Sequence, residues 1–280
     1  MKWTLCAVGL AGLCLTWPAS APAGTRQCPP DSVEVGSVCV DRYEASVWQI
    51  APSNTSLVEK VLAGNATLAD LTSGGAVQLG FTGPPFNQTA YPANFPYTGQ
   101  WTPVPGSNPP SPGVYAISIP GVRPSTCMTW FQAAQACRLS GKRLLTNLEW
   151  QDAADGTPDP GTDNGTSACS ISTAGPVNTG SRANCTSSWG VFDMAANLAE
   201  WVTDWADLSD TGCTDWTTAT GVPGSDFSCV GDDGSPKIPG ALIRGGLWDG
   251  GTDAGVFAVI AFNDPLVLYY SSGIGFRCAR

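Results

Sequence analysis

The sequence predicts an α+β fold that is rich in loops and held together by disulfide bonds. Two short helical patterns lie within residues 125–157, and strand patterns lie within residues 28–48 and near the C-terminus. Gly (33) and Pro (23) are plentiful and charged residues make up only 13% of the chain, a composition typical of a loop-rich protein. The 280 residues are enough to bury the core of one domain, or of one domain with an extension.

Residues 1–23 have the pattern of an export signal. Lys2 supplies a positive start, and the apolar run Leu5–Leu15 is too short to span a bilayer. Small residues follow, and we expect cleavage after Ala23; a buried N-terminal helix fits this pattern less well. The protein is therefore expected to be exported, to the extracellular space, the cell surface or the periplasm, with a single domain over residues 24–280.

The cysteines point to a disulfide framework. The chain has 11 cysteines, of which Cys6 and Cys14 lie in the signal, so that 9 remain after cleavage. An exported chain with so many cysteines is expected to form disulfides, and the odd number leaves a free thiol or an intermolecular bridge. The pairs expected from their positions are Cys28 with Cys39, Cys169 with Cys185, and Cys213 with Cys229.

Charge and composition exclude several classes of function. The net charge is −10 and the pI is about 4.3, and an acidic surface repels phosphate backbones, so we do not expect nucleic-acid binding. The chain has no histidine. This absence rules out nucleophiles that depend on histidine, histidine metal sites and histidine acid–base catalysis.

The first predicted elements are two strands within residues 28–48. Valines alternate with polar residues on both sides of Gly36-Ser37, which predicts a strand–turn–strand unit. The charged segment Asp41-Arg42-Tyr43-Glu44 follows, and we expect it to form an ion pair on the surface.

Residues 49–124 are expected to form an insertion of loops and short strands. They are rich in Pro, Thr, Asn and Gly, contain few charges and show no catalytic grouping. One short helix is expected around Ser56–Ala63. We expect the insertion to pack around its own aromatic residues. These are Phe81, Phe86, Tyr91, Phe95, Tyr97 and Trp101.

Two helices are predicted near the middle of the chain. The first covers Met128–Leu139, with an N-cap at Ser125-Thr126, and its apolar residues recur at helical spacing. The second covers Asn147–Ala154 and begins after Thr146. Glu149 lies three residues beyond Thr146, which is the spacing of a capping box, so we interpret Glu149 as a cap rather than a catalyst.

Several segments carry motifs that can be compared with known families. They are Thr129-Trp130, Gly141-Lys142-Arg143-Leu144-Leu145-Thr146 with Glu149-Trp150, Trp189-Gly190-Val191-Phe192-Asp193-Met194 with Asn197 and Glu200-Trp201, Arg244-Gly245-Gly246, and Gly275-Phe276-Arg277-Cys278. In this order they resemble the motifs of the formylglycine-generating-enzyme/sulfatase-modifying-factor family. The resemblance covers roughly residues 28–48 and 125–280.

This resemblance implies a C-type lectin-like fold, with two helices packed on small, twisted antiparallel sheets. In that fold a cysteine on the first helix is joined to one in the last strand, so the resemblance implies a Cys137–Cys278 disulfide. Closing so long a loop stabilises a fold by about 4–5 kcal/mol in the chain-entropy model.

The resemblance also sets an expectation for catalysis. Enzymes of this family oxidise a substrate cysteine with copper and two active-site cysteines, which lie between the Arg-Gly-Gly and Gly-Phe-Arg motifs. Here the interval Leu247–Ile274 contains no cysteine, so it lacks the thiolates that Cu(I) prefers. A related iron-dependent branch needs histidine. We therefore expect a non-enzymatic protein that requires no cofactor; the alternative is a divergent oxidoreductase of this family that acts on a protein or a cofactor.

Two residues match family positions that help to hold a structural calcium ion. They are Asn197 and Glu200, and ligation by oxygen alone suits Ca²⁺. The alternative is that both side chains only cap backbone groups in a tight aromatic turn.

The C-terminal stretch 241–280 has a further resemblance. Its Arg244-Gly245-Gly246, Trp248, Ala254–Ala258 and Ile274–Arg280 resemble the fixed frame of the variable region in diversity-generating-retroelement target proteins. These phage and bacterial proteins have selected codons on the ligand-facing surface rewritten by a reverse transcriptase. The resemblance implies that the intervening positions vary and bind ligand. They are Leu247, Asp249, Asp253, Ile260, Phe262, Leu266, Val267, Leu268, Tyr269 and Tyr270.

The apolar run Leu266–Tyr270 has two interpretations. Five apolar residues in a row are typical of a buried strand. The resemblance favours a partly exposed patch in which Phe262, Tyr269 and Tyr270 are rigid contact anchors. The expected partner is a macromolecule, either a protein or a cell-surface glycan. A structural surface or virion protein without a selected ligand is the remaining alternative.

Overall fold

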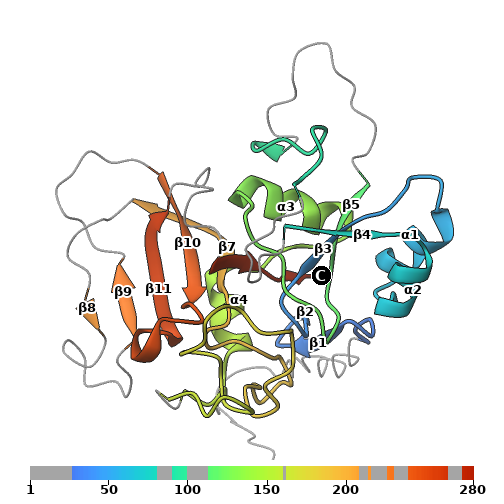
Figure 1. Cartoon of the computed structure of the whole chain (residues 1–280). Helices are drawn as coiled ribbons and strands as arrows, with labels where there is room; N and C mark the ends of the chain where they lie inside the picture. The colour runs from blue at the N-terminus through green and yellow to red at the C-terminus, as the bar shows by residue number, and fades with distance from the viewer. Residues whose placement is uncertain are drawn as a thin grey trace, which may run out of the picture.

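The protein has the α+β architecture that the sequence predicts (Figure 1). A computed structural model describes residues 27–80, 90–99, 113–159, 162–207, 214–215, 226–229, 239–263 and 273–280. Its described helices are α1 (Thr55–Leu62), α2 (Leu68–Ser73), α3 (Trp130–Leu139), α4 (Asn147–Ala153) and the short 3-10 helix η2 (Gly251–Asp253). Its described strands are β1 (Ser32–Val35), β2 (Val38–Asp41), β3 (Ser46–Gln49), β4 (Val77–Leu79), β5 (Val114–Ile117), β6 (Arg143–Leu144), β7 (Ala199–Asp207), β8 (Thr214–Asp215), β9 (Phe227–Cys229), β10 (Pro239–Gly245), β11 (Gly255–Asn263), β12 (Ile274–Phe276) and β13 (Cys278–Ala279). The predicted signal lies outside the described residues.

The described strands form three sheets, with orders β1-β2-β13-β6, β12-β7-β10-β11-β9-β8 and β4-β3-β5. The last strand, β13, lies between β2 and β6, so the C-terminus is held near the centre of the molecule (Figure 1). Most neighbours are antiparallel, as predicted, but β12 pairs with β7 and β11 pairs with β9 in parallel. Helices α3 and α4 packed on small sheets are the predicted features of the C-type lectin-like fold. In the described part of the chain no helix is long and apolar enough to cross a membrane.

The strand–turn–strand unit forms as its sequence predicts. β1 and β2 are antiparallel, with Val35 opposite Val38. Gly36 has a φ of 57°, which L-residues with side chains rarely adopt, so glycine suits this tight turn. The Cys28–Cys39 disulfide joins the start of the unit to β2 across 5.5 Å between Cα atoms.

Helix α3 begins later than predicted. Its N-cap is Thr129, whose side chain accepts from the backbone N–H of Gln132, and Gln132 completes a capping box. Ser125 was expected to cap this helix but instead joins two strands, since its hydroxyl donates to Leu79 O and accepts from Val47 N. The prediction of a second helix capped by Thr146 and Glu149 is confirmed by α4, which has that capping box.

Residues 49–124 contribute more regular structure than expected. The predicted short helix is α1, but a second helix, α2, follows it, and β4 and β5 flank β3 in one sheet. Tyr91 and Phe95 do not pack only within this segment, because both lie against the core cluster that includes Met128 and Ala133 of the α3 region. The segment therefore shares the core of the rest of the chain.

The two carboxylates of the charged segment 41–44 are buried, so their predicted place on the surface is wrong. Asp41 is 1% exposed and Glu44 is 0% exposed. Lys142 compensates Asp41 at 2.6 Å, and the Glu44 carboxylate accepts from Leu198 N. These partners lie more than 100 residues away in the chain, so local sequence does not reveal them.

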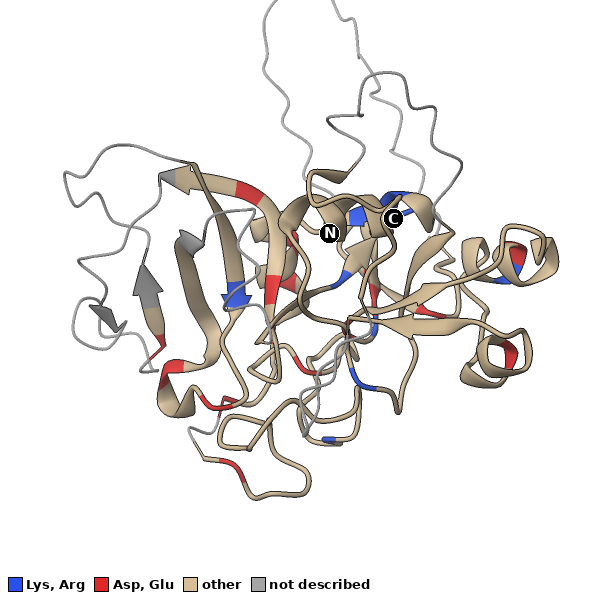
Figure 2. Cartoon of the chain, turned by 45° about the horizontal axis from the view of Figure 1, so that its top comes forward, with Lys and Arg blue, Asp and Glu red and all other residues tan. Residues whose placement is uncertain are grey.

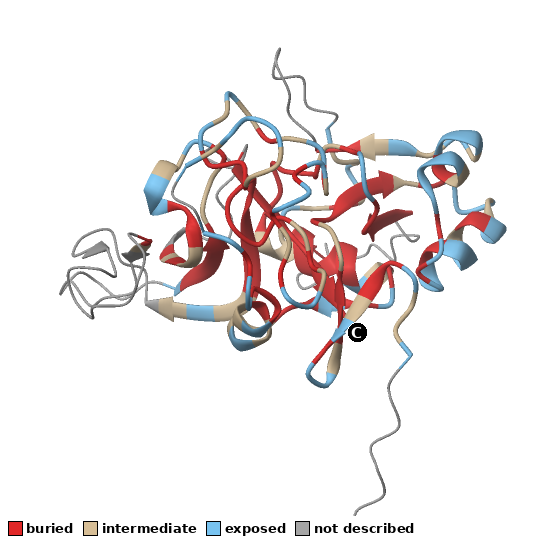
Figure 3. Ribbon diagram, turned by 90° about the horizontal axis from the view of Figure 1, so that it is seen from below, coloured by how far each residue is buried: buried red, intermediate tan, exposed pale blue. Residues whose placement is uncertain are grey.

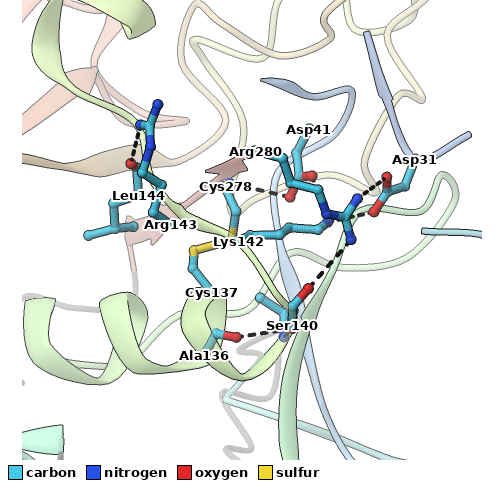
Figure 4. Close-up of a disulfide and its surroundings, with 11 residues drawn as sticks. Asp31, Asp41, Ala136, Cys137, Ser140, Lys142, Arg143, Leu144, Cys278 and Arg280 are labelled. Carbon is cyan, nitrogen blue, oxygen red and sulfur yellow. Dashed lines mark hydrogen bonds and ion pairs between the residues drawn. A yellow bond between two sulfur atoms is a disulfide. The ribbon is translucent and has the colours of Figure 1, made fainter. Parts of the chain in front are cut away.

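A disulfide and an ion-pair network fasten the C-terminus to the rest of the fold (Figure 4). Cys137 of α3 is bonded to Cys278 of β13, which is the pairing implied by the family resemblance. Next to it, the Lys142 ammonium lies 2.6 Å from a carboxylate oxygen of Asp31 and 2.6 Å from one of Asp41. Burial raises the pKa of Asp41 to about 6, although the Lys142 charge opposes this shift.

The core lies on both faces of the sheet that contains β7 and β10. Trp201 and Ile243 face α3, whereas Val202 and Leu242 point to the opposite face, towards Trp150 of α4. This alternation is the period-2 pattern of strands. Buried residues accordingly concentrate in the central strands, and exposed ones in the loops and on α1 and α2 (Figure 3). The sheet is thereby a rigid base for the C-terminal stretch.

Candidate functional site

The first fixed motif of the C-terminal stretch is anchored by Arg244, at the end of β10. Arg244 is 4% exposed, and its guanidinium lies 4.5 Å from the centre of a Trp150 ring. It donates to Ala258 O at 2.9 Å and to Val256 O at 3.0 Å. Further hydrogen bonds reach the side chains of Asn147 and Gln151 on α4. This one side chain therefore ties β10 to β11 and to α4. Burial lowers its pKa to about 10.

The two glycines after Arg244 are required by the space around them. Gly245 and Gly246 have φ values of 87° and 84°, a conformation that strains any other residue. A Cβ on Gly246 would lie 2.5 Å from the Cα atom of Ala254. The motif thus allows the turn after β10 to pass directly over the residue that precedes β11.

The second fixed motif is anchored by Arg277, which is 1% exposed. Its guanidinium lies 2.6 Å from a carboxylate oxygen of Glu200 and donates to Phe192 O at 2.9 Å. Phe276, its neighbour, is completely buried. A Cβ on Gly275 would lie 2.5 Å from a methyl group of Leu198. Both ends of the C-terminal stretch are therefore locked into the core.

The predicted ligand-binding residues between these anchors are placed differently. Asp249 and Asp253 are exposed, on the turn after β10 and on η2. Leu247 and Ile260 are partly buried and pack against the core cluster of α3. Phe262 lies in β11, but its side chain is outside the described part of the structure, as are the predicted ligand-binding residues 266–270.

A second layer of loop supports the turn that carries Asp249. Trp248 accepts from Thr173 N at 2.8 Å, and Gly251 donates to Ile171 O at 2.8 Å. This supporting loop is closed by the Cys169–Cys185 disulfide, a pairing that agrees with the sequence prediction. Exposed side chains on the turn are thus presented from a backbone that is held on its inner side.

A carboxyl pair that the sequence analysis missed lies beneath the start of β11. Asp226 is 1% exposed and accepts from Phe257 N at 2.6 Å. Its carboxylate and that of Asp159 both lie where a Cβ on Gly255 would be, so only glycine fits there. Burial raises the pKa of Asp159 to about 7, with a further contribution from the charge of Asp226 and their mutual hydrogen bond. Because such a bond requires a shared proton, the pair titrates as a unit.

The two predicted calcium ligands do not share a partner. Asn197 accepts from Val177 N at 2.7 Å and donates to the Glu44 carboxylate. The oxygens of Glu200 instead accept from Arg277 and, at 2.8 Å, from the Trp150 ring N–H. A guanidinium occupies the place that a cation would need at Glu200, so this donor set does not fit a calcium ion bound by both residues. No group of three or more acidic or thiol side chains suited to a metal occurs among the described residues.

The Glu200–Arg277 pair belongs to a larger buried acidic network. Burial raises the pKa of Glu44 well above its usual value, and the nearby charges of Asp193 and Glu200 add to the shift. The pKa of Asp193 is raised to about 6, again mainly by burial. Arg277 opposes both shifts, so it is the cation that makes these buried carboxylates tolerable.

Three further cysteines are Cys213, Cys229 and Cys127. The predicted Cys213–Cys229 pair lies outside the residues whose side chains are described. Cys127 is a free, buried cysteine. It lines a cavity of about 390 Å³ together with residues such as Tyr91 and Gln132.

Three comparisons show which known proteins this chain is similar to. A tail fiber receptor-binding protein of Bordetella phage BPP-1 is 27% identical over 136 residues, which is 49% of this chain and 33% of that protein. Solved structures of the Major Tropism Determinant align over 90% (P3c variant) and 89% (M1 variant) of this chain, with 20% identity and TM-scores of 0.43 and 0.44. The chain spans 52% of each of those structures. The model of the sulfatase-modifying factor enzyme 1-like domain matches residues 21–280. The chain therefore belongs to the family of sulfatase-modifying factor enzyme 1-like domains.

Proposed function

We propose that this chain is an exported, non-enzymatic receptor-binding protein that presents residues 241–280 as its ligand surface. The observation that carries the proposal is the contrast within this stretch. The anchors Arg244 and Arg277 are buried and hydrogen-bonded to other segments, whereas Asp249 and Asp253 between them are exposed. The ligand is a macromolecule, either a protein or a cell-surface glycan.

This contrast suits a surface whose side chains differ between copies of the protein. Substitutions at exposed positions usually change the free energy of unfolding by less than about 0.5 kcal/mol. Asp249 can therefore change without disturbing the fold, while Gly246 and Arg277 cannot. Backbone hydrogen bonds from the 169–185 loop hold the turn that carries Asp249. The shape of the turn therefore does not depend on which side chains it exposes.

The comparisons support the same proposal. One relative is named as a receptor-binding protein of a phage tail fiber, and we carry that general role, binding to a receptor, to this chain. The interval Leu247–Ile274 contains no cysteine, so the paired thiolates expected of a copper enzyme in this family are missing from it.

A binding screen tests the proposal. The wild type and a variant with positions 247, 249, 253, 260, 262 and 266–270 all changed to Ser are screened against arrays of cell-surface proteins and glycans. A control variant changes Glu34, Glu59 and Leu62, which are exposed elsewhere, to Ser. We expect the wild type and the control to share ligands that the first variant loses. Identical profiles for all three proteins would reject the surface.

The diversification of this surface has a separate genomic test. We expect a near-copy of the codons for residues 241–280 beside a reverse transcriptase gene, with mismatches confined to adenines of the template. Mismatches spread over all four bases would contradict diversification, while leaving ligand binding by a constant surface open to the screen.

The catalytic alternative rests on the family description, which names an enzyme. Cys127 is the free thiol among the described residues, so it is the described residue at which copper could bind. Titration with Cu(I) measures this alternative directly. Stoichiometric, tight binding that disappears in Cys127→Ser would favour the enzyme over the binding protein.

A further inference from the structure

Three aromatic rings form a cluster on the face of the sheet that α3 covers. Trp205 of β7 lies 5.0 Å from Trp130 and 5.8 Å from Phe131, between ring centroids, and all three rings meet edge to face. Trp130 is fixed by donating its ring N–H to Val202 O at 2.7 Å. Trp205 nevertheless remains 38% exposed. An exposed tryptophan held in position by two other rings is a typical contact anchor of an interface.

Strand register places this cluster beside the proposed ligand surface. Trp205 is opposite Ala241 of β10, and Ala241 is opposite Asn263 of β11. Two strand spacings, about 10 Å, therefore separate Trp205 from the end of β11. Ile260 packs against the same core cluster as Trp130, so the aromatic rings and this predicted ligand-binding residue share one face of the sheet.

The same part of the chain carries most of the negative charge. Residues 199–263 contain ten Asp and Glu but only two basic residues, Lys237 and Arg244, which gives a net charge of −8 out of −10 for the whole chain. Arg244 is 4% exposed, and Glu200 and Asp226 are 1% exposed, so neither sign of charge at these three residues reaches the surface. The exposed negative charge of the described part lies on residues such as Asp249 and Asp253. In Figure 2 the described part of this sheet shows several acidic segments, and Arg244 is its one described basic residue.

Negative charge and an exposed indole together favour a partner rich in arginine and lysine. A cation over the face of a tryptophan is attracted by the ring, and arginine stacks on it best. The negative charge of this part of the chain attracts basic surfaces over longer range and repels acidic ones. Nucleic acids and acidic glycans are disfavoured for the same reason.

We propose that the Trp130–Phe131–Trp205 cluster is a constant docking surface, next to the C-terminal ligand surface, for a partner protein that presents arginine and lysine side chains. The inference rests on the proposed receptor-binding function and adds to it the chemistry of the partner. Part of the surface that contacts the partner then lies outside residues 241–280, on α3 and β7.

Binding of a labelled nona-arginine peptide to the full chain tests the proposal, with fluorescence anisotropy as the measurement. An extended peptide of this length reaches about 30 Å, enough to cover the cluster and neighbouring acidic residues. We expect nona-arginine to bind more tightly than nona-lysine, nona-glutamate not to bind, and the affinity to fall as salt is raised. Trp205→Ala is expected to weaken binding about threefold to fivefold.

Matched variants separate a specific site from general attraction. Trp189 is 43% exposed in another part of the chain, and Trp189→Ala is expected to leave the affinity unchanged. Trp205→Tyr keeps an aromatic ring and is expected to retain most of the binding. Circular dichroism and thermal unfolding confirm that each variant is folded. If Trp205→Ala does not fold, Phe131→Ala, which removes a ring that contacts Trp205, replaces it and is expected to weaken binding.

A second pair of variants tests the charge. Asp249→Asn with Asp253→Asn removes two charges from the sheet region, and Glu34→Gln with Glu59→Gln removes two exposed charges elsewhere. The first pair is expected to weaken nona-arginine binding more than the second. Equal losses for both pairs, or for Trp205→Ala and Trp189→Ala, would overturn the docking surface, as would tighter binding of an acidic polysaccharide.

Failure of the docking surface can be distinguished from failure of the proposed receptor-binding function. If ligands found in the array screen depend on residues 247–270 but not on Trp205, the receptor-binding function holds and the docking surface is wrong. If nona-arginine binding depends on Trp205 while no array ligand depends on residues 247–270, the docking surface holds and the variable ligand surface is wrong.

Discussion

The two anchors of the C-terminal stretch and the interval between them differ in burial and in the number of other segments that their side chains contact. Arg244 and Arg277 each bind groups from several other segments, and both are at least 96% buried. Asp249 and Asp253 are exposed on a turn whose backbone is held from the inside. One set of residues therefore holds the shape of this stretch, and a different set forms its exposed surface. Exposed side chains of this kind can be substituted without loss of the fold.

The largest loss of stability is expected when the Cys137–Cys278 disulfide, which fastens the C-terminus, is removed. Cys137→Ser with Cys278→Ser removes a link that closes a loop with a sequence separation of 141. In the chain-entropy model this costs about 5 kcal/mol of unfolding free energy. Urea denaturation followed by tryptophan fluorescence measures the loss. A loss below about 1 kcal/mol would show that the ion pairs alone hold the C-terminus.

Removing the cation of the second anchor is expected to cost nearly as much. Arg277→Met leaves Glu200 buried without its ion-pair partner, beside Glu44 and Asp193. Loss of one partner of a buried pair destabilises by about 3–5 kcal/mol. The same denaturation experiment applies. Arg277→Met with Glu200→Gln should recover part of the loss, and failure to do so would place the cost in packing rather than charge.

The first anchor is tested by adding a single methyl group. In Gly246→Ala the new Cβ meets the backbone of Ala254 at 2.5 Å, and the backbone keeps a φ of 84° that alanine disfavours. We expect a loss of about 1–3 kcal/mol. Gly251→Ala is the matched control, since it also has a positive φ but has nothing within 4 Å of the new Cβ. Equal losses would assign the effect to φ alone.

The pH dependence of stability tests the carboxyl pair of Asp159 and Asp226 beneath the start of β11. The pKa of Asp159 is raised to about 7 in the folded protein, so the folded state binds its proton more tightly than the unfolded state does. Stability from this group is therefore present at low pH and is lost as the pH rises towards about 7. We expect thermal unfolding to show a decline between pH 5 and pH 7.

A variant identifies the group responsible for that decline. Asp159→Asn should flatten the slope, whereas the slope contributed by Asp41 and Asp193, whose pKa values are raised to about 6, should persist. An unchanged slope in Asp159→Asn would contradict the shared proton at Asp226.

The smallest effect is expected within the interval itself. Asp249→Ser with Asp253→Ser changes only exposed side chains, so the free energy of unfolding should shift by less than about 0.5 kcal/mol for each. Ligand binding in the array screen should change at the same time. A destabilisation above 2 kcal/mol would show that these residues belong to the frame.

The predictions from the sequence succeeded where the interactions are local. The alternating valines around Gly36 and the capping box of Thr146 with Glu149 are short-range patterns, and both elements formed. The N-cap of α3 was misplaced because Thr129 and Ser125 are equally good caps in isolation. Only the approach of β3 and β4 engages Ser125 elsewhere.

Parts of the site depend on residues that meet only in three dimensions. Glu44 joins Asn197 and Leu198 across more than 150 residues, so no local pattern indicated that its carboxylate would be buried. Asp159 and Asp226 likewise come from two turn-rich spans without any motif. The Glu200–Arg277 ion pair likewise joins residues that are 77 apart in the chain, and the motifs that contain them do not show that they meet.

The fold class, the two anchor motifs and the absence of histidine and of thiols between them could all be predicted from the sequence. These features follow from local pattern, residue identity and family motifs. Three-dimensional packing sets which charges are buried, which residues of the interval face solvent, and that Trp205 lies beside β10. The physical reason is that burial and charge pairing depend on distances between segments far apart in the chain, which a linear pattern does not contain.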